Sequence, residues 1–396
     1  MITTDVFIAG AGLAGSIAAL SYAKSARNVV LADPLSHNES SKFDYRTTAY
    51  LQPSKSFLEL IGVWDCVKDS AMPLEVMKII DASGLGDTGQ IKSEKNFISS
   101  EISDLPFGWN IKNSLMRTTL QNLIEHQRNC KLITGIRAVD FISRDEAAYV
   151  KLSSGKTVKA KLVIAADGRN SALRKKAGIS IKTHNFGQKA LAFAVTHSIP
   201  HKNISTEIHL SGGPFTFVPL PDHEGKPSSA VVWMEKSEKA SKLMEMKNKE
   251  FEEEMTQRSC NILGPLKLAS KRSLWPIISQ VADRIYSQRL ALIGETAHVV
   301  PPIGAQGLNM SLADIKFLSD LDKKYPDDLG STHSLNEYQK NRIADIRQRV
   351  IGVSTLNHIS ISESKVVQNI RAFGLENFFQ VPAVKNRAMK LGLGYS

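Results

Sequence analysis

The sequence predicts an α/β protein in which a parallel sheet with helices is interrupted by a mainly antiparallel sheet and followed by C-terminal helices. Three observations predict this fold. The first 35 residues show a strand–helix–strand pattern, residues 184–235 contain short strand-like runs between turns, and a buried strand returns at residue 290. With 396 residues, 42% of them hydrophobic, the chain can bury a large core.

The chain begins with a βαβ unit. Residues 6–9 and 29–32 are short apolar runs, which are typical of buried strands. Between them, Leu13, Ile17 and Leu20 recur at the spacing of one helix face. The two runs are therefore expected to be parallel neighbours joined by the helix.

The rest of the chain is predicted to form further helices and strands. The apolar patterns predict a helix at 114–127, a strand at 161–166, strands at 191–195, 206–210, 215–218 and 230–234, a charged helix at 238–257, a strand at 290–294, and helices over 308–318 and 335–357. No linker is visible, so we expect interleaved domains: a first domain over 1–75, 105–180 and 280–350, an inserted domain over 76–104 and 181–279, and a helical tail over 351–396.

Composition excludes several classes of protein. Cys66, Cys130 and Cys260 form no CxxC pair, which argues against a disulfide scaffold, a zinc site or an iron–sulfur cluster. The histidines show no metal-ligand spacing, so no metal is expected. The sequence contains no run of 18 apolar residues, and its first strand begins at once. We therefore expect neither a membrane span nor a signal peptide.

The formal net charge of +11 creates a field that attracts phosphate, nucleic acid or anionic lipid. The basic residues are scattered, and no basic motif interleaved with aromatics indicates nucleic-acid binding. Two explanations stay open: a soluble protein that is generally rich in lysine, and a protein that meets a membrane surface. We expect a cytoplasmic location, with peripheral attachment to the inner face of the cytoplasmic membrane under the second explanation.

A glycine fingerprint, Gly-x-Gly-x-x-Gly, follows the first strand and opens the first helix. Gly10 permits the tight turn, Gly12 lets backbone N–H groups approach a pyrophosphate, and Gly15 allows close packing of helix and strand. The helix N-terminus adds about half a positive charge. Asp33 ends the second strand, where its carboxylate can accept hydrogen bonds from ribose hydroxyls. These features predict a dinucleotide site, and a glycine turn without a ligand is the alternative.

Two further motifs narrow the prediction. One is Asp-Gly-Arg-Asn-Ser-Ala-Leu-Arg at 167–174, and the other is Gly-Glu-Thr-Ala-His at 294–298, continued by Pro-Pro-Ile-Gly-Ala-Gln-Gly-Leu-Asn at 301–309. In order and spacing, the three motifs resemble the signatures of class A flavoprotein monooxygenases of the para-hydroxybenzoate hydroxylase type. Shorter segments resemble the ubiquinone-biosynthesis hydroxylases within that class: 46–49, 60–64, 110–113 with Arg117, 186–188 and 305–309.

The resemblance implies a Rossmann-like FAD-binding domain with an inserted substrate domain, and FAD as the cofactor. The residues that it implies for FAD are Gly10, Gly12, Gly15, Asp33, Arg46, Arg117, Asp167, Gly168, Gly294, Glu295, Gly307, Leu308 and Asn309. Asp167-Gly168 would also serve a passing nicotinamide nucleotide, and residue 295 the ribityl chain. The loop at 304–309 directs a helix N-terminus at the negative N1–C2=O edge of reduced flavin. An ordinary helix-start turn is the alternative for this loop.

The resemblance also implies the reaction: hydroxylation of the aromatic ring of a polyprenyl phenol in ubiquinone synthesis, with O2 and NADH or NADPH, through a flavin C4a-hydroperoxide. The cofactor then does the chemistry, while the protein orients the substrate and excludes water. His298 and Pro301 are the catalytic candidates because their loop should border the site of oxygen reaction. His298 can carry a proton near neutral pH, and a packed, hydrogen-bonded loop histidine is the alternative.

Other functions fit the same motifs. A hydroxylase of a soluble aromatic compound is one, whereas a flavin halogenase is disfavoured because Trp-x-Trp is absent. The sequence also departs from the family pattern at three positions: Glu295 stands for Asp, and Ala305 and Ser311 stand where glycine is common. The extra methylene of Glu295 moves its carboxylate by roughly 1.5 Å. A non-catalytic flavin-binding member of a quinone-synthesis assembly is therefore a further alternative.

The inserted sheet is expected to roof the substrate cavity. Phe193, Phe215, Phe217 and Trp233 are candidates to line the cavity, with core packing as an equal alternative. The apolar and basic tail at 373–391 resembles that of the ubiquinone hydroxylases, which points to a membrane surface or to other quinone-synthesis proteins as partners. A tail docked on the protein's own core is the alternative.

Overall fold

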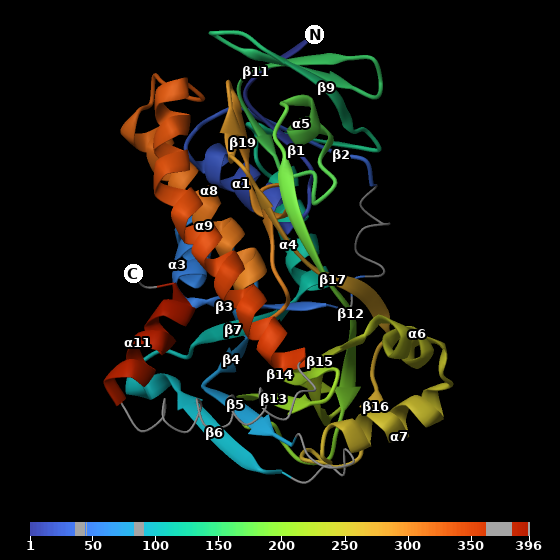
Figure 1. Ribbon diagram of the computed structural model, residues 1–396. Helices are drawn as coiled ribbons and strands as arrows, with labels where there is room; N and C mark the ends of the chain where they lie inside the picture. The colour runs from blue at the N-terminus through green and yellow to red at the C-terminus, as the bar shows by residue number, and fades with distance from the viewer. Residues whose placement is uncertain (36–43, 45, 83–90, 362–381, 395–396) are drawn as a thin grey trace.

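The computed structural model describes residues 1–35, 44, 46–82, 91–361 and 382–394. Figure 1 shows a large sheet in the upper half of the view and another in the lower half. The long helix α9 (Thr332–Ile361) runs from the first to the second, and contacts strands of both. A small sheet lies between them, made of β3 (Thr47–Leu51), β7 (Gly108–Lys112) and β4 (Met72–Leu74).

The upper sheet is the predicted βαβ unit with further strands on both sides. Its path runs through β18 (Tyr286–Ser287), β19 (Leu290–Leu292), β11 (Thr157–Ala165), β1 (Ile2–Ala9), β2 (Val29–Asp33) and β8 (Cys130–Thr134), with β9 (Ala138–Ser143) and β10 (Ala148–Leu152) joined through β11. β1 pairs in parallel with both β11 and β2. Residues 6–9 of β1 are all buried, as expected for a parallel strand covered on both faces.

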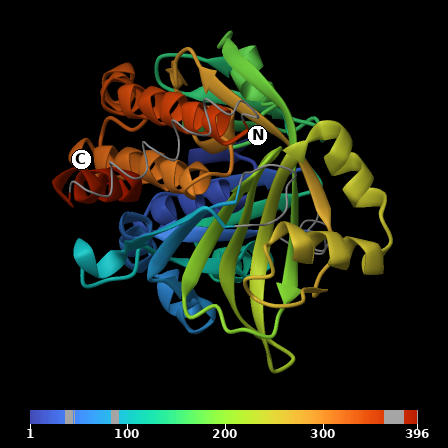
Figure 2. The same cartoon turned by 60° about the horizontal axis from the view of Figure 1, so that its bottom comes forward.

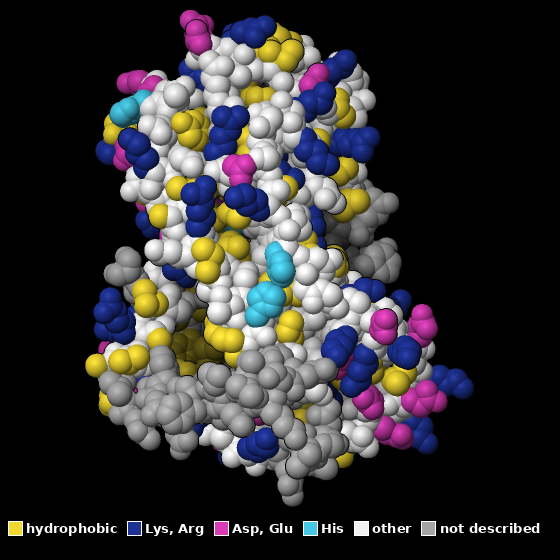
Figure 3. All heavy atoms as spheres, in the orientation of Figure 1, with side chains coloured by type: hydrophobic (Ala, Val, Ile, Leu, Met, Phe, Trp, Pro, Cys, Tyr) yellow, Lys and Arg dark blue, Asp and Glu magenta, His cyan; other side chains and the backbone are white. Residues whose placement is uncertain are grey.

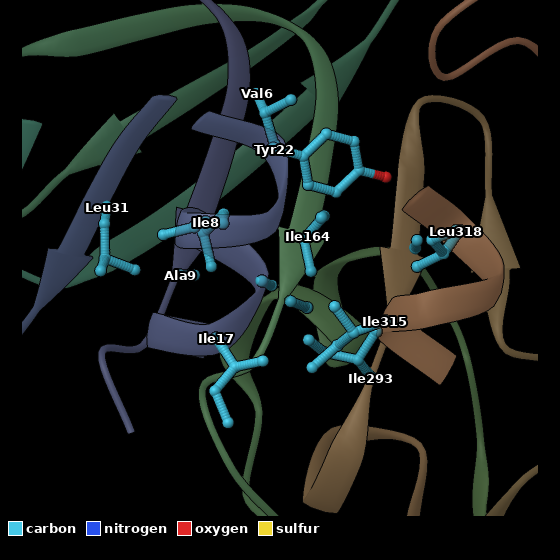
Figure 4. Close-up of a cluster of buried hydrophobic side chains, with 14 of the residues drawn as sticks. Val6, Ile8, Ala9, Ile17, Tyr22, Leu31, Ile164, Ile293, Ile315 and Leu318 are labelled. Atoms are coloured by element: carbon cyan, nitrogen blue, oxygen red, sulfur yellow. The ribbon is translucent and has the colours of Figure 1, made fainter. Parts of the chain in front are cut away.

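Three helices pack beside the upper sheet: α1 (Leu13–Lys24), α4 (Asn113–Glu125) and α8 (Gln306–Lys324). Figure 4 shows the resulting core, where Ile8 and Ile164 of adjacent strands lie near Ile17 of α1, and Ile315 of α8 lies near Ile293. All five side chains are at most 1% exposed. The chain therefore returns to this core after residue 290, as its apolar pattern predicts.

The lower sheet is mainly antiparallel, in the order β20-β17-β12-β15-β14-β13-β5-β6. Its strands are β5 (Val76–Asp81), β6 (Ser93–Ile98), β12 (Ile181–Thr196), β13 (Ile204–Leu210), β14 (Gly213–His223), β15 (Lys226–Lys236), β17 (Ser273–Ala282) and β20 (His298–Val299), with the short β16 (Lys267–Leu268) on β12. Because side chains alternate along each strand, neighbouring residues face opposite sides of the sheet.

Two helices cover one side of the lower sheet, and α9 lies on the other side (Figure 2). The sequence predicts one charged helix at 238–257, but the structure has α6 (Ser237–Glu245) and α7 (Asn248–Arg258). The helix is broken because Met246 and Lys247 adopt extended backbone, with ψ angles of 147° and 148°. After the break, α7 buries Phe251 and Met255 in the core of the lower sheet.

Two of the predicted domain limits fall inside single elements. The limit at 350/351 lies within α9, because its buried stripe continues from Val350 to Val353. The limit at 279/280 lies within β17. Of the predicted tail, residues 373–381 lie outside the described residues, and α11 (Pro382–Leu393) follows them. Among the helices that the structure describes, none is both long enough and apolar enough to cross a bilayer.

Candidate functional site

The glycine fingerprint touches the second motif. Gly10 has a φ of 99°, and a Cβ there would lie 2.3 Å from the carbonyl oxygen of Ala166. A Cβ on Gly15 would lie 1.8 Å from the carbonyl oxygen of Gly10. Both positions need glycine, because α1 and the residues after β11 approach each other this closely.

The start of α1 is open to a ligand. A Cβ on Gly12 would meet no atom within 4 Å. No side chain in the described ranges caps α1, and its first turn holds no acidic residue. Asp33 lies beside this turn, where its carboxylate accepts hydrogen bonds from the N–H groups of Ala11 at 2.6 Å and Leu35 at 2.8 Å. An uncapped first turn suits a phosphate, and the contact of Asp33 with ribose stays a prediction.

Hydrogen bonds join the second motif to the third. Asp167 accepts a hydrogen bond from the N–H of Ala172 at 2.9 Å, at the start of α5 (Ala172–Lys176). Gly168 follows with a φ of 82°, which turns the chain toward the third motif. The buried Arg174 donates to the carbonyl oxygen of Thr296 at 3.0 Å. The Asp-Gly turn therefore lies next to residues 294–296.

Two of the three departures from the family pattern have partners in this region. Glu295 is exposed and forms an ion pair with Arg169 of the second motif at 3.2 Å. Ser311 donates to the carbonyl oxygen of Gly307 at 3.0 Å. The Ser311 hydroxyl faces Gly294, which has no side chain. A Cβ at position 294 would crowd this hydroxyl, because it would lie 3.1 Å from the Ser311 Oγ. A side chain at position 311 is thus matched by the glycine opposite it.

The loop at 304–309 leads into α8 through two left-handed residues, Gly304 with a φ of 62° and Ala305 with a φ of 57°. A Cβ makes this conformation costly, so glycine would adopt it at position 305 with less strain than alanine does. Asn309 fastens the loop to β3. Its Nδ2 donates to the carbonyl oxygen of Ala49 at 2.8 Å, and its Oδ1 accepts from the N–H of Leu51 at 2.9 Å.

Arg46 and Arg117 lie around Asp44, a residue that sequence reasoning missed although it stands two positions before Arg46. Arg46 donates from Nε to Asp44 at 2.8 Å, and Arg117 lies 4.0 Å from the same carboxylate. Burial alone would raise the pKa of Asp44, but the hydrogen bond and charge of Arg46, with the charge of Arg117, hold it below its usual value. The Arg46 guanidinium also stacks 4.3 Å from the ring centre of Trp275.

His298 belongs to β20 and is 2% exposed. Its Nε2 lies 2.7 Å from Oδ2 of Asp314 on α8, and the other oxygen of Asp314 accepts from Nε of Arg342 on α9 at 2.9 Å. Pro301 is buried in the same loop, and its carbonyl oxygen accepts from the N–H of Ile303 at 2.8 Å. The imidazole is therefore packed and hydrogen-bonded. A direct part for His298 or Pro301 in the reaction stays a prediction.

The four aromatic candidates for the substrate cavity belong to a different core. Phe193, Phe215, Phe217 and Trp233 are at most 1% exposed and lie on the side of the lower sheet that α6 and α7 cover. The Phe193 ring lies 5.2 Å from that of Phe251 on α7. Core packing, which the sequence left as an equal alternative, therefore accounts for the positions of these aromatics.

The opposite side of the lower sheet faces the third motif. There Ala190, Met234 and Ile277 pack against Ile303 of the motif loop and Val353 of α9, with Phe186, Val232 and Val300 partly buried around them. Ala190, Val232 and Met234 come from the strand positions that alternate with the aromatic ones. An aliphatic wall therefore lies beside the loop that leads into α8.

The donor groups around the joined motifs fit FAD, whose pyrophosphate is anionic and whose flavin becomes anionic when reduced. The buried Nε of Arg117 has no hydrogen-bond partner within the described part of the chain. At the start of α8, no described side chain caps the helix, and a Cβ on Gly307 would meet no atom within 4 Å. Leu308 is half-buried beside Gly307. Two open helix starts and an arginine whose buried Nε lacks a partner among the described residues are donors of the kind that such a ligand requires.

Comparisons with known proteins agree with this fit. The family model described as FAD binding domain matches residues 3–350. Ubiquinone hydroxylase UbiL of Rhodospirillum rubrum is 27% identical over 395 residues, covering 98% of this chain and 89% of that protein. The 3-demethoxyubiquinol 3-hydroxylase of Escherichia coli is 25% identical, covering 99% of this chain and 98% of that protein.

A solved structure shows the same fold. The crystal structure of p-nitrophenol 4-monooxygenase PnpA from Pseudomonas putida superposes with a TM-score of 0.80 at 17% identity, covering 99% of both chains. The monooxygenase fold expected from the motifs is thereby confirmed, as is the cofactor that they imply. The chain belongs to the FAD binding domain family, and its cofactor is FAD.

Proposed function

We propose that this protein is an FAD-dependent monooxygenase that hydroxylates the aromatic ring of a polyprenylated phenol in ubiquinone synthesis. The observation that carries the proposal is the aliphatic wall of the lower sheet, which lies directly beside the loop of the flavin site. Such a wall suits a lipid-like substrate. Relatives that match nearly the whole chain are named ubiquinone and demethoxyubiquinol hydroxylases, which supports this substrate class.

Bound FAD supplies the redox chemistry, for which NADH or NADPH provides electrons and O2 provides the oxygen atom. The residues of this chain hold the cofactor. The open starts of α1 and α8 and the guanidinium of Arg117 bind its negative groups. The carboxylate of Asp33 lies beside the first turn of α1, and that of Glu295 lies beside Arg169 of the second motif; both can accept hydrogen bonds from hydroxyl groups of the cofactor.

The aliphatic wall orients the substrate and excludes water from the reacting ring. Met234, Ile277 and Ile303 are each at most 9% exposed, so little of the wall meets solvent. Excluding water protects reactive intermediates from hydrolysis. Figure 3 shows an apolar hollow on the surface, which comparison with Figure 1 places between α11 and the C-terminal part of α9. We assign this hollow as the access route for the apolar substrate.

The test is mass spectrometry of quinone lipids in cells that lack the protein. We expect a prenylated phenol that lacks one ring hydroxyl to accumulate, and the gene supplied in trans to remove it. In vitro, the purified yellow protein should oxidise NADH or NADPH faster with this lipid and place one atom of isotopically labelled O2 in the product. Unchanged quinone lipids in the deletion cells would contradict the proposal.

The same assays separate the alternatives. A hydroxylase of a soluble aromatic compound would leave the quinone lipids unchanged, yet would oxidise NADH or NADPH in the presence of a soluble phenol. A non-catalytic flavin-binding member of a quinone-synthesis assembly would change the lipids but show no substrate-stimulated oxidation. Each outcome is distinct from that of the polyprenyl hydroxylase.

We also infer that α11 meets an anionic membrane surface. The helix carries the exposed Arg387 and Lys390 and no acidic residue, whereas its Lys385 is paired with Glu101 at 2.7 Å. Its side chains Val384 and Leu391 are 48% and 53% exposed. Basic groups beside exposed apolar ones suit the headgroup region of a bilayer, where a polyprenyl substrate resides. This surface adjoins the hollow in Figure 3, so the substrate could pass from the bilayer into the site.

A further inference from the structure

A chain of hydrogen-bonded side chains begins just before the loop at 299–305. His298 precedes this loop and pairs with Asp314 at 2.7 Å, and Asp314 accepts from Arg342 at 2.9 Å. The Asp314 side chain is fully buried, and Arg342 is 8% exposed. A buried carboxylate needs such partners, because removing one leaves a charge without compensation in a nonpolar environment.

The same series of hydrogen-bonded side chains ends just after the loop. Arg342 also donates from Nη1 to Asp345 at 2.8 Å, and Asp345 accepts from Nε of Arg349 at 2.7 Å. Arg349 then donates from Nη1 to Oε1 of Gln306 at 2.7 Å. Gln306 is the first residue of α8. Two arginines of α9 therefore hold both ends of one loop.

Gln306 is fully engaged inside the protein. Its Nε2 donates to the carbonyl oxygen of Gly304 at 2.8 Å and to that of Gly392 in α11 at 3.0 Å. The helix α11 is itself fixed to the core by Met389 and Leu393, which pack with Leu51 and Phe107. Gln306 thus links the start of α8 to both α9 and α11 and acts on the site through the backbone of its loop.

We propose that Arg342 and Arg349 are positioning residues, which hold the start of α8 in the geometry that binds and stabilises reduced flavin. The proposal rests on the proposed function, since it requires flavin at the start of α8. Preorganised N–H groups stabilise a developing negative charge because they need not reorient when it forms. Ala305, in its left-handed conformation, persists only if the surrounding contacts hold it there.

The test compares two arginines of α9. Arg349→Ala removes the hydrogen bond to Gln306, and we expect FAD to bind roughly 10- to 100-fold more weakly, as for a lost charged hydrogen bond. We also expect the reduction potential of bound FAD to fall. Arg347→Ala is the matched control, because Arg347 is exposed and, among the described residues, donates to the carbonyl oxygen of Asp283 at 3.0 Å, away from the loop. Arg349→Lys should restore part of the affinity, since its ammonium can reach one of the two partners.

A second variant tests the positioning role in case Arg349→Ala fails to fold. Gln306→Glu keeps an acceptor for Arg349 but loses the donor to the carbonyl groups of Gly304 and Gly392, and we expect it to lower the flavin potential. Wild-type affinity and potential in both variants would overturn the positioning role. Failure of the wild-type protein to bind FAD would instead overturn the proposed function. Thermal unfolding of each apoprotein separates a loss of folding from a loss of positioning.

Discussion

Ala305 holds a backbone conformation that its own Cβ opposes. A left-handed residue with a Cβ costs roughly 1–2 kcal/mol. Replacing Ala305 by glycine should therefore raise the free energy of unfolding by about 1 kcal/mol, after part of the gain is lost to the greater entropy of an unfolded glycine. Urea denaturation of the apoprotein measures the change. A variant less stable than the wild type would show that the alanine side chain makes contacts worth more than this cost.

Gly12 and Gly15 are glycine for different reasons: Gly12 leaves room for a ligand, whereas Gly15 allows close packing within the protein. At Gly15 an added Cβ meets the carbonyl oxygen of Gly10 at 1.8 Å, so Gly15→Ala should lose about 1–3 kcal/mol of stability. At Gly12 the Cβ meets no protein atom within 4 Å. Gly12→Ala should therefore change stability by less than about 0.5 kcal/mol, yet weaken FAD binding because the backbone can no longer approach the pyrophosphate. Fluorescence titration with FAD and urea unfolding test the pair, and equal stability losses would contradict it.

Asp44 makes the stability of the protein depend on pH in the acidic range. Its pKa is lower in the folded protein than its ordinary value of 3.8, because Arg46 and Arg117 stabilise the carboxylate. A lowered pKa means that the contribution to stability is complete above this ordinary value and is lost as the pH falls through the folded pKa. Asp44→Asn should therefore be less stable at neutral pH, by about 1.5–3 kcal/mol, and the difference from wild type should shrink below pH 3.8. Unfolding curves of both proteins, measured at neutral pH and below pH 3.8, test this prediction. A stability difference between Asp44→Asn and the wild type that did not change with pH would contradict it.

At the scale of elements, adjacent residues of β15 belong to two different hydrophobic clusters. Trp233 faces α6 and α7, whereas Met234 faces the third motif. Trp233→Ala should cost about 3–5 kcal/mol of stability and leave the KM for the substrate unchanged in the folded fraction. Met234→Ala should raise the KM, because it removes part of the aliphatic wall. Steady-state kinetics with urea unfolding tests both, and an unchanged KM in Met234→Ala would place the substrate elsewhere.

The helices α8 and α9 could be predicted from their apolar stripes, and each stripe contains a charged residue. Asp314 shares a helix face with Met310 and Leu318, and Arg342 lies between Tyr338 and Ile346 on the buried side of α9. A charge within a buried stripe predicts a buried ion pair. The partners themselves could not be predicted, because their pairing depends on how two helices cross after the chain turns between them.

The faces of the lower sheet illustrate the same limit. Alternation along a strand separates its residues into two sets, but it does not say which set meets α6 and α7 and which meets the flavin site. Large aromatics fill the side that two helices cover, and smaller aliphatic residues lie on the side that faces the loop leading into α8. The glycine motifs were predictable because their requirement is local: each glycine is set by contacts of the backbone around it.

At the scale of the whole molecule, the net charge of +11 is spread over the chain, so binding to a membrane depends on where apolar side chains accompany the charge. We expect the protein to sediment with anionic vesicles, less with neutral ones, and less at high salt. The double variant Arg387→Glu and Lys390→Glu in α11 should reduce binding. Lys151→Glu with Lys156→Glu makes the same change of charge at exposed sites on the far sheet and should leave binding nearly unchanged. Equal losses in both variants would mean that charge alone drives the association.

The upper sheet is completed late in the chain, because β11 gains its parallel partner β19 only after strands β12 to β17 of the lower sheet have intervened. A ribosome adds roughly 5–20 residues per second, so the C-terminal half of β11 emerges on the order of ten seconds before Leu290. Through that interval a newly made chain exposes an apolar strand edge that is competent to pair with a neighbouring molecule. Chaperone capture of nascent chains that extend past residue 165 but not yet to 290 is the consequence to expect, and slow translation of the insert should worsen aggregation.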